Sequence, residues 1–486
     1  MKDLLIVGSG VCGLASAALL SQTHHVRVLE AGPRPGGVAA ITELDGLRFC
    51  AGPQYLWGFG PQGPGTRILA KMGLSVPMTK MAADFDQLQI GDGPMRPMRE
   101  GMCEGLLEQV FSQFPEQAVA VAAFCELLDQ IGRTCEAISD NARFMNSGPA
   151  MLGYLVRSRT PGAALLVRVH GESLGSMALK MGVNPTALRA LTAHQSIFGE
   201  SNAELSLVLF AAARHHLKAD RWIPDGGTAA LISGLVTRVQ EQAHLCLQHR
   251  ALALRRENGR WHLLAQTPNG NVELQADAVI LACPPSVSAE LLPDLTLRYQ
   301  PSYGVTALCL SVAGPPKLMR ALANKNLNWF ADAESDVDFS IPAQTLQALN
   351  LTAPSLNGSP IAENAVLVAF YPHGEEPHDM AQQAIARIRE MMGEHGHFEV
   401  LAQEIIDGPA WSQDFGAPSG AIYGRRLSVD SMLTPAIQGL PKHVYVAHSG
   451  AGISGVMGCL EMAERAAQAL LPASQRQPNA SPQRAT

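Results

Sequence analysis

The sequence predicts an α/β protein: a doubly wound parallel sheet built from discontinuous segments, with an inserted second domain of α+β type. The short apolar run of residues 4–7 is typical of a strand buried on both faces, and residues 26–29 predict a second strand. Residues 14–20, rich in Ala and Leu, predict a helix between these strands, as in a βαβ unit. The length, 486 residues, exceeds the roughly 100–200 of one domain and predicts two or three domains.

Composition excludes several classes of protein. Hydrophobic residues make up 47% of the chain, which is enough for a large core and excludes a disordered chain. The 45 Gly and 32 Pro follow no period, so a collagen-like chain is excluded as well. Because the net charge is −7 and Lys and Arg form no block, the basic patch of a nucleic-acid binder is missing from the sequence.

The nine cysteines are scattered, and none stands in a C-x-x-C spacing. We therefore expect reduced thiols, a cytoplasmic location and no metal site. The first residues imitate a signal peptide, but Gly8, Gly10 and Gly13 interrupt the apolar run. A membrane-spanning helix is not expected, since no uninterrupted apolar run approaches the roughly 18–20 residues that it requires; peripheral membrane contact is possible but not expected.

A glycine motif joins the first predicted strand to the first predicted helix. Gly8, Gly10 and Gly13 form G-x-G-x-x-G together with Val11 and Cys12. In this motif the first glycine makes a tight turn, the second lets the backbone approach a pyrophosphate, and the third lets helix and strand pack closely. The helix N-terminus then offers backbone N–H groups and partial positive charge to the phosphates. The alternative is a structural turn without a ligand.

Glu30 ends the second predicted strand at about the distance from the motif that is usual for the acid that binds ribose hydroxyls. An acid at this position, rather than a basic residue, favours an adenosine ribose without a 2′-phosphate. NADP is therefore disfavoured.

The residues after Glu30 distinguish FAD from NAD. Ala31 and Arg34 lead to a Gly36–Gly37 pair, and a predicted hairpin then leads to Gly52. This order resembles the N-terminal signature of the flavin amine oxidase superfamily, particularly its phytoene desaturase and carotenoid isomerase branch. The resemblance implies that the Gly-Gly pair lies against FAD phosphates and that Gly52, Pro53 and Gln54 approach the flavin ring.

Two later segments support this resemblance. Residues 222–227 are similar to the family's P-x-G-G segment before a long helix, here residues 228–242. Residues 276–284 are similar to its A-D-x-V-I-x-A strand, which implies that Ala282 and Cys283 lie at the cofactor. Ala251 stands where the family usually has a Val whose backbone meets the adenine. Residues 260–264 and 272–274 alternate like the strands of a hairpin.

The C-terminal segment completes the resemblance and also departs from it. Residues 416–424 resemble the branch's G-G-A-x-Y-G stretch, and the strand at 444–448 precedes Gly455, Val456 and Met457 at a helix start. The family usually ends this strand with Gly and an acid, whereas this chain has Ala447 and His448. One hypothesis is that His448 donates a hydrogen bond to the phosphates or the flavin, in which case the affinity for FAD should rise as protonation increases at low pH. The alternative is that His448 only caps the end of the strand.

The resemblance implies a Rossmann-like FAD-binding domain of residues 1–75, 205–285 and 412–471, and a substrate-binding domain of residues 76–204 and 286–411. The helical patterns at 106–114, 118–138 and 174–181 suit an apolar substrate cavity and an ordinary core equally. The apolar run 163–167 fits a core helix or a membrane-surface contact. Residues 472–486, rich in Ser, Pro, Gln and Asn, predict a disordered tail.

The implied chemistry is removal of a hydride from a substrate C–H onto non-covalently bound FAD, leaving C=C or C=N. We expect a largely apolar small-molecule substrate, with Tyr55 and Trp57 near the flavin face as aromatic walls; the alternative for them is loop packing. The sequence identifies no general base. A double-bond isomerase without net redox, and a non-catalytic flavoprotein, remain open.

Overall fold

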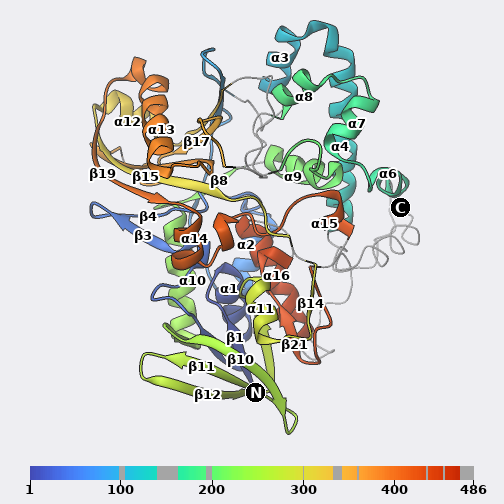
Figure 1. The fold of residues 1–486 in the computed structure, drawn as a ribbon, viewed down its shortest axis with the longest axis vertical. Coiled ribbons are helices and arrows are strands. Elements are labelled where there is room, and N and C mark those ends of the chain that lie inside the picture. Colours follow the sequence, from blue (N-terminus) through green and yellow to red (C-terminus); the bar gives the residue numbers. More distant parts are fainter. Residues whose placement is uncertain are drawn as a thin grey trace.

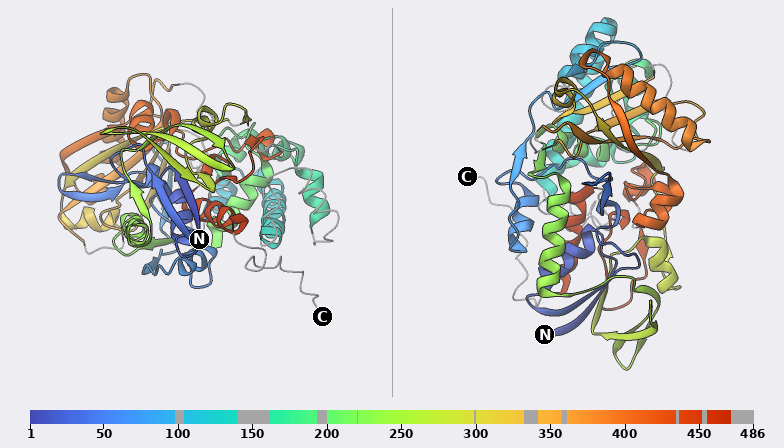
Figure 2. Two further views of the ribbon diagram at one scale, coloured as in Figure 1. Left: turned by 90° about the horizontal axis from the view of Figure 1, so that it is seen from below. Right: turned by 90° about the vertical axis from the view of Figure 1, so that its left-hand side faces the viewer.

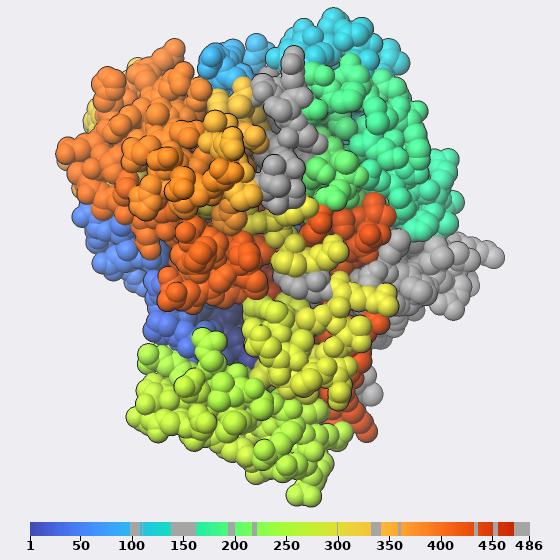
Figure 3. All heavy atoms as spheres, in the orientation of Figure 1, coloured from blue at the N-terminus to red at the C-terminus, as the bar shows by residue number. Residues whose placement is uncertain are grey.

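The computed structural model describes most of the chain, and Figure 1 shows its arrangement. The described residues are 1–97, 104–139, 162–192, 200–219, 221–298, 300–331, 342–357, 361–433, 436–451 and 455–470. The predicted tail at 472–486 lies outside them. A parallel-sheet unit carries the N-terminus (Figures 1 and 2), and a second sheet and a group of helices lie side by side above it (Figures 1 and 3).

The parallel sheet contains strands from three distant parts of the chain. Its order is β21-β13-β1-β2-β9, and every pairing is parallel. The strands are β1 (Lys2–Val7), β2 (His24–Leu29), β9 (His244–Cys246), β13 (Ala278–Leu281) and β21 (Val444–Val446). The strands predicted at residues 4–7 and 26–29 therefore lie side by side within the sheet, and the predicted doubly wound α/β fold is confirmed.

Three helices pack together on this sheet: α1 (Val11–Leu20), α10 (Thr228–Gln242) and α16 (Gly455–Leu470). Figure 1 shows α1 between α10 and α16. Leu14 and Ala18 of α1 are fully buried, and both belong to one apolar cluster with residues of α10 and α16. Small side chains on α1 let neighbouring backbones approach closely, which places its N-terminus at the carboxyl ends of β1 and β13.

Antiparallel strands extend this unit. The predicted hairpin after the second glycine turn is β3 (Ile41–Leu44) paired with β4 (Leu47–Cys50). The predicted hairpin at 260–274 is also present, and a third strand joins it. The three strands are β10 (Arg250–Glu257), β11 (Arg260–Thr267) and β12 (Gly270–Ala276).

A second, mostly antiparallel sheet of seven strands lies above, in the order β19-β15-β18-β17-β16-β6-β7. These strands are β19 (Glu399–Ile406), β15 (Val305–Ala313), β18 (Asn364–Pro372), β17 (Ala348–Thr352), β16 (Asn326–Phe330), β6 (Asp86–Ile90) and β7 (Arg96–Pro97). Helices α12 (Pro316–Leu322) and α13 (Pro377–Met391) share an apolar cluster with one face of it. The other face looks toward the helices and the parallel-sheet unit.

The helices beside this sheet share a single apolar cluster. They are α3 (Glu104–Gln113), α4 (Ala118–Ser139), α6 (Ala163–Val169), α7 (Leu174–Lys180), α8 (Pro185–Leu191) and α9 (Leu207–Ala219). Ala163 and Leu166 of α6 are buried in the cluster, which favours the core interpretation of the run at 163–167. Helix α9 packs on α4, although it lies inside the predicted FAD-binding segment 205–285. We therefore propose that this segment begins near Trp222.

Short elements connect these units. They are α2 (Pro64–Lys71), β5 (Met78–Lys80), η2 (Pro115–Gln117), β8 (Trp222–Pro224), α11 (Pro285–Leu291), β14 (Thr296–Leu297), α14 (Gly408–Phe415), α15 (Val429–Leu433) and β20 (Ile437–Gln438). No helix in the described ranges has both the length and the hydropathy that crossing a membrane requires.

Candidate cofactor-binding and active site

The turn from β1 into α1 has no room for a side chain at two of its glycines. Gly8 has φ of +101°, and a Cβ there would lie 2.8 Å from the Ala282 carbonyl oxygen. A Cβ on Gly13 would lie 2.0 Å from the Gly8 carbonyl oxygen. Real Cβ atoms do not approach backbone oxygen so closely, so both positions require glycine for the fold itself.

Gly10 differs from these two glycines. A Cβ on it would have no described heavy atom within 4 Å, and its φ of −61° suits any residue. The open space lies at the N-terminus of α1, whose first turn contains Val11 and Cys12 and no acid. An opening at the positive end of a helix, beside backbone N–H groups, fits a pyrophosphate. The geometry therefore accommodates a dinucleotide where the motif predicts it.

The second glycine turn packs directly on the first. Gly36 has φ of +118° and donates its N–H to the Ser9 carbonyl oxygen at 2.9 Å. A Cβ on Gly37 would lie 3.2 Å from Gly10 Cα. Arg34 instead turns toward α14, with its guanidinium carbon 5.7 Å from the centroid of the Phe415 ring. The Gly-Gly pair is thus at the opening, as the resemblance implies, and Arg34 lies at its edge.

Glu30 joins the first glycine turn to the loop that leads into the second. One carboxylate oxygen accepts from Ser9 N–H at 2.9 Å and from Ser9 Oγ at 2.6 Å. The other accepts from Gly32 N–H at 2.8 Å. Because a carboxylate has about four acceptor positions, one remains for a ribose hydroxyl. Glu30 therefore has a structural role that the sequence analysis did not predict, besides the predicted role at the ribose.

The neighbouring predicted contacts lie around this turn. Ala282 donates its N–H to the Val7 carbonyl oxygen at 2.8 Å, and Cys283 follows it beside Gly8. Burial raises the pKa of Cys283 to about 11, so its thiol stays neutral. The Glu30 carbonyl oxygen accepts from His249 N–H at 2.7 Å, which places β10, and with it Ala251, near the predicted adenosine end.

His448 follows β21, and its Nδ1 accepts from Gly450 N–H at 2.8 Å. Burial lowers the pKa of His448 to about 4. The imidazole is therefore neutral at physiological pH and carries its proton on Nε2. This corrects the expectation that a protonated His448 attracts the phosphates near neutral pH. Its predicted place at the cofactor remains a proposal, with Nε2–H as a neutral donor.

The segment from Gly52 to Trp57 meets the N-terminus of α16. Thr228 Oγ1 donates to the Pro53 carbonyl oxygen at 2.7 Å. A Cβ on Gly455 would lie 3.9 Å from Trp57 Nε1, and one on Gly58 would lie 3.4 Å from Met457 Sδ. The segment after Gly52, which the resemblance places near the flavin ring, and the predicted helix start at Gly455 are therefore neighbours in space.

Gln54 is buried in the same segment, and its side-chain N–H groups donate to the carbonyl oxygens of Cys50, Ala51 and Gly52 at 3.1 Å each. Its Oε1 is buried and has no hydrogen-bond partner within the described part of the chain. Such a buried acceptor is costly unless a ligand meets it. A hydrogen-bond donor on the cofactor or the substrate would satisfy this oxygen.

Tyr55 lies between the units. Its ring contacts Phe85 edge to face, with 5.4 Å between centroids, and burial raises the pKa of its hydroxyl well above the usual value. Asp86, Arg221 and Tyr423 are its electrostatic neighbours. The phenol is therefore neutral, in a setting enclosed by protein.

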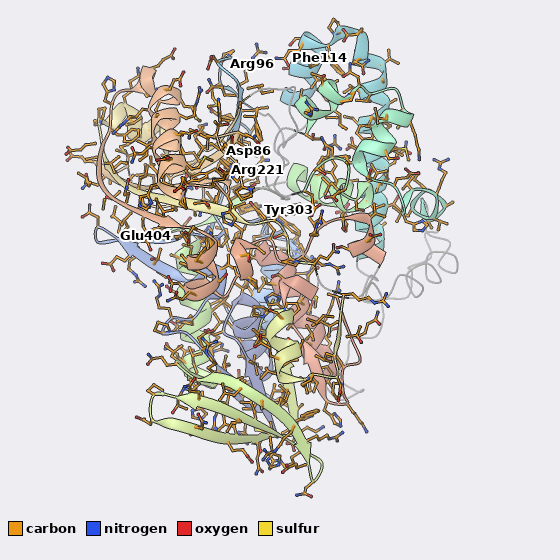
Figure 4. All side chains as sticks on the ribbon, in the orientation of Figure 1. Asp86, Arg96, Phe114, Arg221, Tyr303 and Glu404 are labelled. Carbon is orange, nitrogen blue, oxygen red and sulfur yellow. The ribbon has the colours of Figure 1, made fainter. Side chains whose placement is uncertain are left out.

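Asp86, Arg221 and Tyr423 were missed by the sequence analysis. Asp86 Oδ2 and Arg221 Nη1 form a buried ion pair at 2.7 Å, shown near the centre of Figure 4. Arg221 directly precedes the recognised segment 222–227, and Tyr423 lies inside the recognised segment 416–424. These two residues could therefore have been proposed from their motifs, whereas no motif around Asp86 indicates that it pairs with Arg221.

Cys459 on α16 faces α1. The pKa of Cys12 is raised well above its usual value, chiefly by a hydrogen bond with Cys459 and also by burial. Both cysteines are free thiols. Cys459 thus contacts the helix that begins at the glycine motif, and non-covalent binding of the flavin stays a prediction.

This geometry is that of an α/β protein with an opening that fits a dinucleotide at the N-terminus of α1 and a second domain above its parallel sheet. The chain belongs to the family of flavin-containing amine oxidoreductases, whose model matches residues 11–471. The resemblance to the flavin amine oxidase superfamily is thereby confirmed, while its phytoene desaturase branch remains a prediction.

Individual relatives are distant. The chain is 24% identical over 246 residues to all-trans-retinol 13,14-reductase of Rattus norvegicus, a match that spans 49% of this chain and 39% of that protein. A mutant of putrescine oxidase superposes with a TM-score of 0.63 at 18% identity, covering 96% of this chain and 98% of that one. A putative protoporphyrinogen oxidase from Exiguobacterium sp. gives 0.59 at 18% identity, with the same coverage. These structures support the fold.

Substitution of the two glycines should separate cofactor binding from folding. We expect Gly10→Val to leave the fold intact and to remove FAD, because its side chain would occupy the opening. Gly13→Val should instead destabilise the apoprotein, because its Cβ meets the Gly8 backbone. FAD content per chain and the thermal midpoint of each apoprotein are the measurements. Full FAD content in Gly10→Val would exclude this opening as the pyrophosphate site.

Glu30→Ala should weaken FAD binding by about 1.5–3 kcal/mol, the usual worth of a hydrogen bond to a charged group. That is roughly ten- to a hundredfold in Kd, measured by FAD titration of the apoprotein. Glu43→Ala, on an exposed position of β3, removes an equal charge and should change nothing. If Glu30→Ala keeps the parent affinity, the ribose assignment is wrong.

The affinity for FAD should be flat between about pH 5.5 and 8, since His448 stays neutral above its depressed pKa of about 4. His448→Asn, which keeps a short acceptor for Gly450 N–H, should bind FAD more strongly than His448→Ala. The same lowered pKa predicts how the free energy of unfolding depends on pH. Between about pH 6.5 and 4 the unfolded chain protonates His448 whereas the folded chain does not, so the free energy of unfolding falls as the pH drops through this range. The result that would contradict this prediction is an affinity for FAD that increases from pH 8 to 5.5 in the parent and stays constant in His448→Ala. It would show that protonated His448 attracts the phosphates.

Proposed function

We propose that this protein is an FAD-dependent oxidoreductase that removes a hydride from a C–H bond of a largely apolar, unsaturated small molecule and leaves C=C or C=N. One observation carries the proposal: the Gly36–Gly37 turn links the opening at α1 to the segment Gly52–Trp57. A Cβ on Gly37 would lie 3.2 Å from Gly10 Cα, and a Cβ on Gly52 would lie 2.3 Å from the carbonyl oxygen of Val38, the next residue along the turn. Family membership supports a flavin as the cofactor. Bound FAD would supply the two-electron acceptor.

The residues described above would hold FAD without a covalent bond. Gly10 and Gly37 leave space for the pyrophosphate at the end of α1, and Glu30 offers its remaining acceptor position to the ribose. The N-terminus of α16 at Gly455 would face the flavin ring beside Trp57. His448 would donate from neutral Nε2.

The character of the second domain supports an apolar substrate. Tyr55 and Trp57 are partly buried, and both pack against the apolar cluster of helices α3 to α9. Aromatic walls continuous with an apolar cluster suit a flat, unsaturated molecule and exclude water from the site. A neutral phenol at Tyr55 can hydrogen-bond the substrate without introducing charge.

The names of the relatives leave the direction of the reaction open. Putrescine oxidase is named for oxidation of an amine, and the retinol relative is named for reduction at positions 13 and 14 of all-trans-retinol. A net oxidation needs an electron acceptor that returns the flavin to its oxidised form. An isomerase that moves double bonds would consume none.

The purified protein should be yellow and should release FAD, rather than FMN, on denaturation. Anaerobic photoreduction should bleach it, and admission of air or a quinone should restore the colour if the flavin turns over with an acceptor. Gly10→Val, purified in parallel, is the colourless control. Release of FMN, or a colourless parent that takes up no FAD, would refute the proposal; a flavin that no acceptor reoxidises would favour the isomerase or a non-catalytic role.

A further inference from the structure

Three inner strands of the seven-stranded sheet carry buried polar side chains on one face. On β16, Asn326 and Asn328 point away from helices α12 and α13, while Leu327 and Trp329 pack in the cluster with those helices. On β17, Asn350 and Thr352 share the face of Asn326, since Asn328 lies opposite Asn350 and Asn326 opposite Thr352. Polar residues on the inner face of a sheet are uncommon unless they have a partner or a ligand.

Hydrogen bonds fix the orientation of these amides. Arg221 has only donors, so Asp86 Oδ2 accepts from it, and Asp86 Oδ1 accepts from Asn326 Nδ2 at 2.7 Å. Asn326 therefore presents Oδ1 to Asn350, whose Nδ2 donates to it at 2.7 Å. The same Nδ2 donates to Asn328 Oδ1 at 2.8 Å. Both N–H groups of Asn350 are thus used, and its Oδ1 is left as an acceptor.

Two oxygens on β17 lack a partner. Among the hydrogen bonds of the described residues, none ends on Asn350 Oδ1. Thr352 is only 2% exposed, and its buried Oγ1 has no hydrogen-bond partner within the described part of the chain. A buried hydroxyl without a partner costs free energy. A buried hydroxyl without a partner, on the same strand face as the oriented Oδ1 of Asn350, points to a ligand.

Water reaches this face from inside the molecule. Strand β17 is an inner strand, with β18 and β16 on either side, and its opposite face is covered by the cluster with α12 and α13. Asn350 is nevertheless partly exposed. The space next to it must therefore lie between this sheet and the units that it faces.

This space adjoins the proposed flavin site. Arg221 precedes β8, and Trp222 pairs through its backbone with Leu56, the residue after Tyr55. A Cβ on Gly227 would lie 3.3 Å from the Pro354 carbonyl oxygen, two residues beyond Thr352. Both contacts lie at the end of the strands that carries Asp86, Asn326 and Thr352. Through Trp222 and Thr228 this end is connected to the segment Gly52–Trp57.

We propose that Asn350 Oδ1 and Thr352 Oγ1 form a site for a neutral hydroxyl group on an otherwise apolar substrate. This inference rests on the proposed function and specifies its substrate. Asp86 is the sole acid in β6, β16 and β17, and Arg221 neutralises it. An ammonium group would therefore meet no free carboxylate on these strands, and burying it would be costly.

Three probes of equal size test the site in the FAD-loaded protein: 1-octanol, 1-methoxyheptane and octylamine. The ether accepts hydrogen bonds but donates none, and the amine is charged at neutral pH. The parent should bind octanol roughly two- to tenfold more tightly than the ether, as one neutral hydrogen bond would give, and more tightly than the amine. Perturbation of the flavin spectrum and the shift of the thermal midpoint are independent readouts of binding.

Asn350→Leu and Thr352→Val should each lose the preference for octanol over the ether. Thr352→Val should also raise the thermal midpoint of the ligand-free protein, because it replaces the unpartnered hydroxyl with a methyl group. Asn269→Leu, the same exchange as Asn350→Leu at an exposed turn, should retain the preference. If Asn350→Leu does not fold, Thr352→Val decides alone.

Equal affinity of the parent for octanol and the ether, stronger binding of octylamine, no binding of octanol, or a preference that persists in Thr352→Val would overturn the inference. The thermal readout does not depend on the flavin. A parent that lacks FAD but prefers octanol therefore contradicts the proposed function alone, and an FAD-loaded parent without the preference contradicts only the hydroxyl site.

Discussion

The close approach of α1 to β1 and β13 is the constraint on which the rest of the structure depends. A Cβ on Gly13 would meet the Gly8 carbonyl oxygen at 2.0 Å, so helix and strand touch through backbone alone. This contact aims the N-terminus of α1 at the carboxyl ends of the parallel strands. Glu30 and the Gly36–Gly37 pair then close around that N-terminus, and distant segments from β13 and β21 complete the same edge of the sheet.

Two ion pairs with a fully or almost fully buried carboxylate lie at the second domain. Asp86 and Arg221 lie 2.7 Å apart, both buried, and Arg426 meets the fully buried Glu200 through two hydrogen bonds at 2.7 and 2.9 Å. Buried pairs of this kind add little net stability compared with apolar packing, but breaking one is costly. Their effect is to fix orientation: the pair at Asp86 determines which way each amide of Asn326 and Asn350 points.

Burial determines the charge of His448, the residue that stands where the family usually has an acid. A histidine in place of the family's acid suggests an exchange of negative for positive charge. Gly450 N–H occupies Nδ1, and burial lowers the pKa to about 4, so the position becomes a neutral donor. The chain thus departs from its family in hydrogen-bond polarity and keeps the position free of positive charge near neutral pH.

The sequence by itself determined the parallel-sheet unit, because its signals are local. Gly8, Gly13 and the buried strand before them are neighbours in the chain, and their steric needs appear as residue types at fixed spacing. Helix α10 likewise begins at Thr228 and ends at Gln242, as predicted. The seven-stranded sheet was not predicted, because its strands carry no motif and pair across long stretches of chain. Only the tertiary structure decided that Asp86 meets Arg221 and that Asn350 meets Asn326, because these partners are far apart in the sequence. It also decided that His448 is neutral, because its lowered pKa depends on burial.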